Sequence, residues 1–179
     1  ESKSASKLKL INVDLSSEGE KLDKFDSLAV LELQNNQLSR FPLNFYSNPN
    51  LQYLSSVGNP IQGFSNEIFG LRSLSVLKLI KTKIDSFPAS FKYLSSLKEF
   101  EFQINESDSC KLGSSLAGLR SVKKILINKV KLKEFPVDID KSSNLKELYL
   151  IDCGLSSIHV SLYSCSNLEV LILDNNNLE

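Results

Sequence analysis

The segment LAVLELQNNQL, residues 28–38, has leucines at its first, fourth, sixth and eleventh positions and an asparagine at its ninth. This pattern starts again every 23 residues through almost the whole chain. Eight copies can be placed, starting near residues 5, 28, 51, 74, 97, 122, 145 and 168. A fixed period of this length predicts a solenoid, in which each copy packs on its neighbours.

One interval is longer than the others. The spacing from Leu97 to Val122 is 25 residues, and the polar run Glu106–Lys111 is the simplest place for the extra residues. We therefore expect a surface loop in that run.

Each copy begins with an alternation that is typical of a half-buried strand. In the second copy, Leu31 and Leu33 are expected to point inward, whereas Val30, Glu32 and Gln34 point outward. Stacked copies would join these strands into one parallel sheet, about 35–40 Å long at the usual strand spacing. A sheet of this length is long enough to meet another folded domain.

The copies resemble leucine-rich repeats over essentially all 179 residues. Positions 14 and 15 of a copy read Phe-Pro at Phe41-Pro42, Phe87-Pro88 and Phe135-Pro136. This form is similar to the class found in Ras-pathway scaffolds and scribble-type polarity proteins, and similar copies occur in receptor ectodomains. The resemblance implies an α/β solenoid: one domain, residues 1–179, an arc with an open, concave parallel sheet of about eight strands and an irregular or 3-10 helical convex side.

The resemblance also implies structural roles for two positions. The asparagines at position 9 would cap the backbone of the turn that leaves the strand, because a buried turn needs hydrogen-bond partners. They are Asn36, Asn59, Asn105 and Asn176, and Thr82 and Cys153 are weaker substitutes in two other copies. The phenylalanines at position 14 would stack as a hydrophobic spine along the convex side.

Composition limits the class of partner. The chain has 21 basic and 21 acidic residues and a formal net charge of zero, which argues against a nucleic-acid or anionic-membrane binder. No apolar run approaches the roughly 18 residues of a membrane span, so we expect no direct membrane insertion in this segment. Neither end resembles a capping element, and the last copy stops at Glu179. We expect a fragment of a longer protein, whose uncapped ends would also allow end-to-end self-association.

Few residues suit catalysis or metal binding. The sole histidine, His159, stands where other copies have proline, and no phosphate loop, nucleophile motif or metal-ligand cluster is present. We expect neither an enzyme nor a cofactor or metal site. Cys110, Cys153 and Cys165 are expected to be buried free thiols, and a Cys153–Cys165 disulfide is the alternative. The lack of cysteine-rich caps, and a glycosylation sequon whose asparagine faces inward at Asn105, favour a cytoplasmic over an extracellular location.

The outward residues of the sheet are predicted to form columns across the strands. Neighbours in a column touch, so three opposite-charge pairs are expected on this face. They are Lys9 with Glu32, Lys78 with Glu101, and Lys124 with Glu147.

Two apolar patches on the same face are the candidate binding site, because exposed apolar surface with a polar rim commonly marks an interaction site. The first patch contains Val30, Tyr53, Val57, Val76 and Ile80, and the second contains Leu126, Tyr149, Ile151, Val170 and Ile172. The acidic strand that carries Glu99 and Glu101 separates the two patches. The patches are flanked by lysines, namely Lys78, Lys81, Lys83, Lys123, Lys129 and Lys131.

The sequence therefore favours a protein-protein interaction module, a scaffold or regulatory domain that binds a protein or peptide partner on its concave face. Tyr53 and Tyr149 are the candidate anchors. The alternative is the ligand-sensing ectodomain of a membrane receptor or receptor kinase. A third hypothesis is a structural spacer whose concave face is covered by its own chain.

Overall fold

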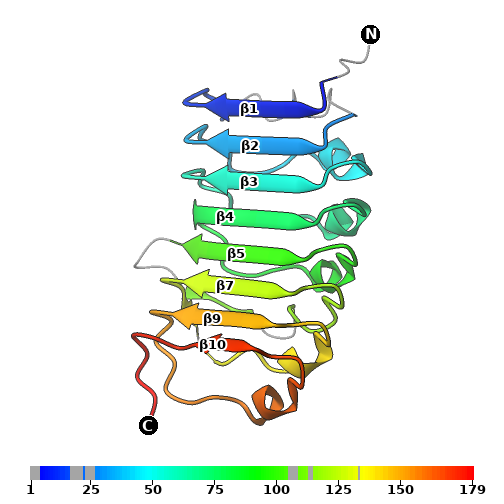
Figure 1. Cartoon of the computed structure of the whole chain (residues 1–179). Coiled ribbons are helices and arrows are strands. Elements are labelled where there is room, and N and C mark those ends of the chain that lie inside the picture. The colour runs from blue at the N-terminus through cyan, green and yellow to red at the C-terminus, as the bar shows by residue number, and fades with distance from the viewer. Residues whose placement is uncertain (1–4, 17–21, 23–26, 105–108, 113–114, 133) are drawn as a thin grey trace.

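The computed structural model describes residues 5–16, 22, 27–104, 109–112, 115–132 and 134–179. Eight strands form one parallel sheet in the order β1-β2-β3-β4-β5-β7-β9-β10, stacked from one end of the molecule to the other (Figure 1). Their bounds are β1 Lys7–Ile11, β2 Val30–Gln34, β3 Tyr53–Val57, β4 Val76–Thr82, β5 Glu99–Ile104, β7 Lys124–Asn128, β9 Glu147–Ile151 and β10 Val170–Ile172. The predicted solenoid with an eight-stranded parallel sheet is confirmed.

Short 3-10 helices lie along one flank of the sheet in the connections between strands (Figure 1). Those in the described residues are η2 Leu43–Ser47, η3 Asn66–Gly70, η4 Ala89–Tyr93, η5 Ile139–Lys141 and η6 Val160–Ser164. The copy that starts at Leu97 differs, because residues 115–118 form turns at the place where its neighbours have helices.

The predicted surface loop at Glu106–Lys111 is only partly correct. Residues 106–108 lie outside the described residues. Strand β6, Ser109–Cys110, pairs in parallel with β8, Lys131–Leu132, and Lys111 forms a bridge with Ser86. The end of the insertion therefore joins a second, two-stranded sheet, in which the Cys110 side chain is buried.

The core lies behind the sheet, where the inward positions of successive strands meet. Leu31, Leu54 and Leu77 are paired neighbours in β2, β3 and β4, and all three are fully buried. Phe100 and Phe102 take the equivalent inward positions of β5. Burying an apolar side chain of this size contributes about 1.5–3 kcal/mol, so the repeated positions account for much of the stability.

The predicted phenylalanine spine is present. The rings of Phe41 and Phe64 stack with centroids 5.7 Å apart, and those of Phe64 and Phe87 stack at 6.4 Å. Phe87 also contacts Phe100 and Phe102, at 5.6 and 5.1 Å. The spine therefore joins the convex side to the inward face of β5.

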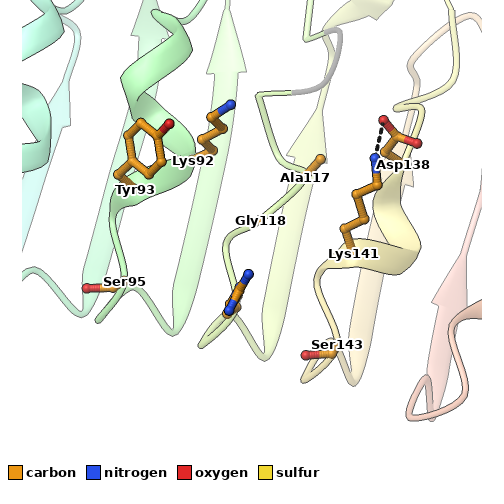
Figure 2. A pocket seen from close by; sticks show the side chains of 9 residues that line it. Lys92, Tyr93, Ser95, Ala117, Gly118, Asp138, Lys141 and Ser143 are labelled. Carbon is orange, nitrogen blue, oxygen red and sulfur yellow. Dashed lines mark ion pairs between the residues drawn. The ribbon is translucent and has the colours of Figure 1, made fainter.

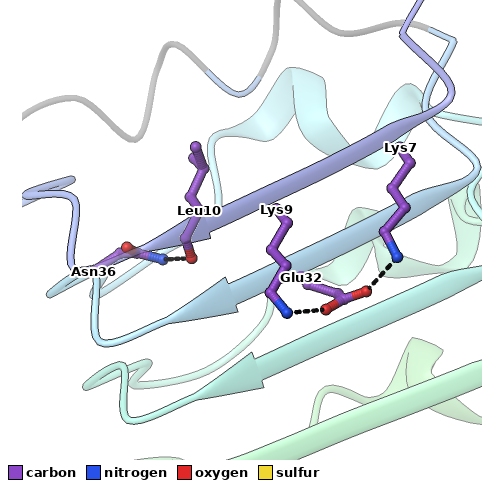
Figure 3. A network of polar contacts seen from close by, with 5 residues as sticks. All are labelled: Lys7, Lys9, Leu10, Glu32 and Asn36. Atoms are coloured by element: carbon purple, nitrogen blue, oxygen red, sulfur yellow. Dashed lines mark hydrogen bonds and ion pairs between the residues drawn. The ribbon is translucent and has the colours of Figure 1, made fainter.

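The asparagine ladder connects neighbouring copies as well as capping turns. Asn59 Oδ1 accepts hydrogen bonds from the backbone amides of Asn36 and Leu38, at 2.7 and 3.4 Å, and its amide donates to the Leu33 carbonyl at 3.2 Å. One copy earlier, Asn36 Oδ1 accepts from the Val13 amide at 2.8 Å, and the Asn36 side-chain amide donates to the Leu10 carbonyl at 3.0 Å (Figure 3). Each asparagine thus satisfies the turn of the copy before it.

The other ladder positions vary. Asn176 repeats the pattern at the last copy, since its Oδ1 accepts from Cys153 and Leu155. The Cys153 thiol donates to the carbonyls of Ile127 and Ile151. This agrees with the prediction that Cys153 is a weaker substitute for the asparagine at position 9. The buried Thr82 hydroxyl has no hydrogen-bond partner in the described part of the chain, so it does not replace an asparagine. Asn105 lies outside the described residues.

In seven copies the residue at position 8 has positive φ, either in the turn after the main-sheet strand or, for Lys81, at the register shift near the end of β4. The non-glycine examples are Asn12, Asn35, Lys81, Lys129, Asp152 and Asn175, with φ between 53° and 57° across this set, and Gly58 has φ 68°. Asparagine, aspartate and glycine tolerate this left-handed conformation, whereas lysine does so at a cost.

Replacing Lys81 with glycine should therefore increase stability by about 0.5–1 kcal/mol, since glycine has no Cβ to strain this left-handed backbone conformation. Urea unfolding followed by circular dichroism measures this change. Lys83→Gly is the matched control, because Lys83 is also exposed but does not have positive φ, and it should be destabilising. Equal losses in both variants would refute the backbone strain at Lys81.

Candidate functional site

The open face of the sheet is the face that carries positions 3, 5 and 7 of each copy, and it corresponds to the predicted concave face. Strand pairing places these positions in continuous columns, because each strand is shifted by one whole copy from the next. One column contains Val30, Tyr53, Val76, Glu99, Lys124, Glu147 and Val170, and another contains Lys9, Glu32, Ser55, Lys78, Glu101, Leu126, Tyr149 and Ile172. The predicted columns are confirmed residue by residue.

The first patch, here the N-terminal patch, spans β2 to β4. Tyr53 lies between Val30 and Val76 in one column, and Val57 lies beside Ile80 in another. All five side chains are half-buried. They form two apolar rows that are open to solvent, and Glu32, Ser55 and Lys78 lie in the column between these rows.

The second patch, here the C-terminal patch, spans β7 to β10. Leu126, Tyr149 and Ile172 are successive neighbours in one column. Ile151 and Val170 lie on the same face, and all five side chains are half-buried. The structure thus places the members of the C-terminal patch in neighbouring positions, divides the N-terminal patch into two rows, and keeps the two patches apart.

Strand β5 separates the patches with acidic side chains. Glu99 is exposed, and Glu101 is half-buried and pairs with Lys78, with Nζ and Oε2 3.1 Å apart. Hydrogen bonding to Glu101 raises the pKa of Lys78. The Lys78 ammonium therefore stays charged at neutral pH.

The other two predicted charge pairs are also present. Lys9 and Glu32 approach to 3.3 Å, and Lys124 and Glu147 approach to 3.2 Å. Lys7 joins Glu32 at 2.8 Å, so that one carboxylate holds two lysines (Figure 3). The hydrogen bond from Lys7 lowers the pKa of Glu32. Exposed pairs add little to stability, but they fix where each charge is held.

Tyr149 is held in place by its neighbours, a feature that the sequence analysis did not predict. Its hydroxyl donates to Glu147 Oε2 at 3.0 Å, and Lys124 Nζ lies 5.1 Å from its ring centroid. The hydrogen bond lowers the pKa of Glu147 and raises that of Tyr149. The signal was the spacing of two residues within β9, which places Glu147 and Tyr149 on the same face.

The cysteines and the histidine make contacts that belong to the fold. All three cysteines are free, and burial raises the pKa of the Cys110 and Cys153 thiols to about 12. His159 is exposed, and its Nδ1 accepts a hydrogen bond from the Ser161 amide at the start of η6. Within the described ranges, no three His, Cys, Asp or Glu residues cluster as metal ligands, and no helix is long and apolar enough to span a bilayer.

No protein-family model matches the sequence. The chain is similar to the volume-regulated anion channel subunit LRRC8D of Rattus norvegicus, with 36% identity over 90 residues. This match covers 49% of the chain and 10% of the channel subunit. About half of the chain therefore matches about a tenth of that subunit.

Solved structures share the fold over nearly the whole chain. A leucine-rich repeat protein of Leptospira interrogans has a TM-score of 0.69 and 23% identity, covering 96% of this chain and 49% of its own. TLR13, in a complex with ssRNA13, has a TM-score of 0.82 and 20% identity, covering 97% of this chain and 25% of its own. At these identities the likeness concerns the fold, and the narrower scribble-type class stays a prediction. With its repeating motif, in-register parallel strands and structural relatives of this kind, the chain has the leucine-rich repeat fold.

Proposed function

We propose that this chain is a protein-recognition module, without catalytic activity of its own, that binds a protein or peptide partner on the open face. The observation that carries the proposal is the pair of half-buried apolar patches, each with a tyrosine near its centre, on a sheet face left uncovered by the described residues. Tyrosine anchors surrounded by polar groups are typical of binding hot spots.

The charged residues support one orientation of a partner. The acidic strand β5 divides the two patches, and lysines at Lys78 and Lys124 stand beside it in the neighbouring strands. A partner with a complementary charge order would dock in one register, because like charges in contact are costly. The LRRC8D match covers a tenth of that subunit, so no channel function is proposed.

Tyr149 is the better organised of the two proposed anchors. The Glu147 hydrogen bond and the Lys124 contact hold its ring before a partner arrives, so less side-chain entropy is lost on binding. Tyr149→Phe should keep most of the affinity, since the ring stays, whereas Tyr149→Ala should lose at least about tenfold.

The test measures the affinity of a purified partner for Tyr53→Ala and Tyr149→Ala variants by calorimetry. Tyr163→Ala is the matched control, because that tyrosine is 77% exposed on η6, away from the open face. It should bind as the unmodified chain does. Unchanged affinity in both Tyr53→Ala and Tyr149→Ala would move the binding site away from the open face.

A further inference from the structure

A second surface, on the helical flank, has the features of a binding site. A groove of about 770 Å³ lies between η4 and η5, with Lys92 and Tyr93 on one side and Lys141 and Asp138 on the other (Figure 2). The turn at Gly118 crosses the space between them. We call this the flank groove. It involves none of the open-face residues.

The groove exists because one copy has small residues on this flank. Counted back from the start of the next copy, Ala117 and Gly118 take the places that Lys92 and Tyr93 occupy one copy earlier. Gly118 has φ 91°, a conformation that favours glycine. A Cβ added at Gly118 would meet only Lys92 within 4 Å, at an ordinary contact distance of 3.7 Å. The small side chain of Ala117 and the lack of one at Gly118 therefore leave this space open.

Asp138 and Lys141 form the other wall of the groove. Asp138 has φ 59° and precedes η5, which is three residues long, whereas η4 has five. The Asp138 carboxylate pairs with Lys141 at 3.0 Å, which fixes the side chains at this edge (Figure 2).

The groove carries an excess of positive charge. Its lining includes the cations Lys92, Arg120 and Lys141 and a single acid, Asp138. Asp138 is paired with Lys141, and neither Lys92 nor Arg120 forms an ion pair with a described residue. Two exposed cations thus remain for a ligand in a chain whose formal net charge is zero.

An apolar hollow adjoins the groove across η4. It has a volume of about 440 Å³ and lies between Phe69 and Tyr93, which are 47% and 63% exposed. The hollow and the groove share Lys92 and Tyr93, and Lys92 Nζ lies 5.2 Å from the Tyr93 ring centroid. Exposed aromatic side chains next to unpaired cations suit a ligand that is both apolar and acidic.

We propose that the flank groove and the adjoining hollow bind an acidic peptide segment of a partner protein that carries one large apolar side chain. The apolar side chain inserts between Phe69 and Tyr93, and the carboxylates that follow it contact Lys92 and Arg120. Copies advance by about 4.8 Å, so the path from η3 to η5 spans on the order of 15 Å, or about five extended residues. The Asp138 carboxylate at the far edge disfavours a longer, uniformly anionic polymer such as a nucleic acid.

The test uses a fluorescein-labelled peptide, Leu-Glu-Asp-Glu flanked by Gly-Ser, and fluorescence anisotropy. The chain should bind it saturably with a Kd below about 1 mM. Lys92→Glu combined with Arg120→Glu should weaken binding at least about tenfold, because two attractions become repulsions. Replacing the acidic residues of the peptide with glutamine, or its leucine with alanine, should weaken binding similarly.

Arg72→Glu is the matched control, because Arg72 is exposed and takes the place of Arg120 two copies earlier, outside the groove. It should bind within about twofold of the unmodified chain, as should Tyr149→Ala, which alters only the open face. The assignment would be overturned if Arg72→Glu or Tyr149→Ala weakened binding as much as the combined Lys92→Glu and Arg120→Glu substitutions do. It would also be overturned by no saturable binding, by binding that survives the Lys92 and Arg120 reversals, or by equal affinity for a charge-matched oligothymidine.

Discussion

Phe87→Ala is expected to lower the free energy of unfolding by about 3–5 kcal/mol, the range for removing a large buried aromatic side chain. Phe87 is 8% exposed and lies where the spine meets the core. Its ring contacts Phe64 along the spine and Phe91, Phe100 and Phe102 within its own and the next copy. Alanine would leave a cavity that these rigid rings cannot close.

Urea unfolding followed by circular dichroism measures the loss. Tyr163→Ala is the control, because Tyr163 is largely exposed and its loss should stay within about 0.5 kcal/mol. Hydrogen exchange should accelerate most in β4 and β5, since a solenoid copy is stabilised by its nearest neighbours. A Phe87→Ala midpoint equal to that of the control would refute the central role of this ring.

Asn59→Leu is expected to cost about 3 kcal/mol or more, because several buried backbone groups would lose their partners at once. Asn59 is fully buried and accepts from two backbone amides of the preceding copy. Its amide donates to Leu33, Ser56 and Val57. Leucine has a similar size but offers none of these contacts, so the loss reports the hydrogen bonds rather than a cavity.

Thr82→Val tests the same ladder from the opposite direction. The Thr82 hydroxyl is buried without a hydrogen-bond partner in the described residues, and valine has nearly the same shape. The substitution should therefore be neutral or stabilising, by up to about 1 kcal/mol. Denaturant midpoints measure the stability of both variants. If Thr82→Val lost as much stability as Asn59→Leu, the hydrogen-bond explanation would be wrong.

The open face was predictable because parallel strands in register convert a linear period into columns. Once Leu31, Leu54 and Leu77 point inward, Tyr53 and Val76 must point outward, since a strand alternates with period 2. The charge pairs followed from the same rule. The hydrogen bond from Tyr149 to Glu147 was not predicted, although both residues were assigned to the face.

The flank groove was not predictable in the same way. It depends on Gly118 taking a positive φ, on the late start of η5, and on which neighbouring side chains reach into the space. These are properties of irregular segments, whose conformation is set by packing rather than by a fixed period. A small Ala-Gly pair in one copy was the available signal.

The repeat, the inward and outward positions, the phenylalanine spine and the open-face columns could be predicted, because each follows from a period of 23 residues applied to regular strands. Three-dimensional packing was needed to show that Asn36 and Asn59 connect neighbouring copies, that Ser109–Cys110 pairs with β8, and that the flank opens between η4 and η5. The physical reason is that regular backbone repeats its hydrogen bonds, whereas turns and connections adopt whichever conformation satisfies their neighbours.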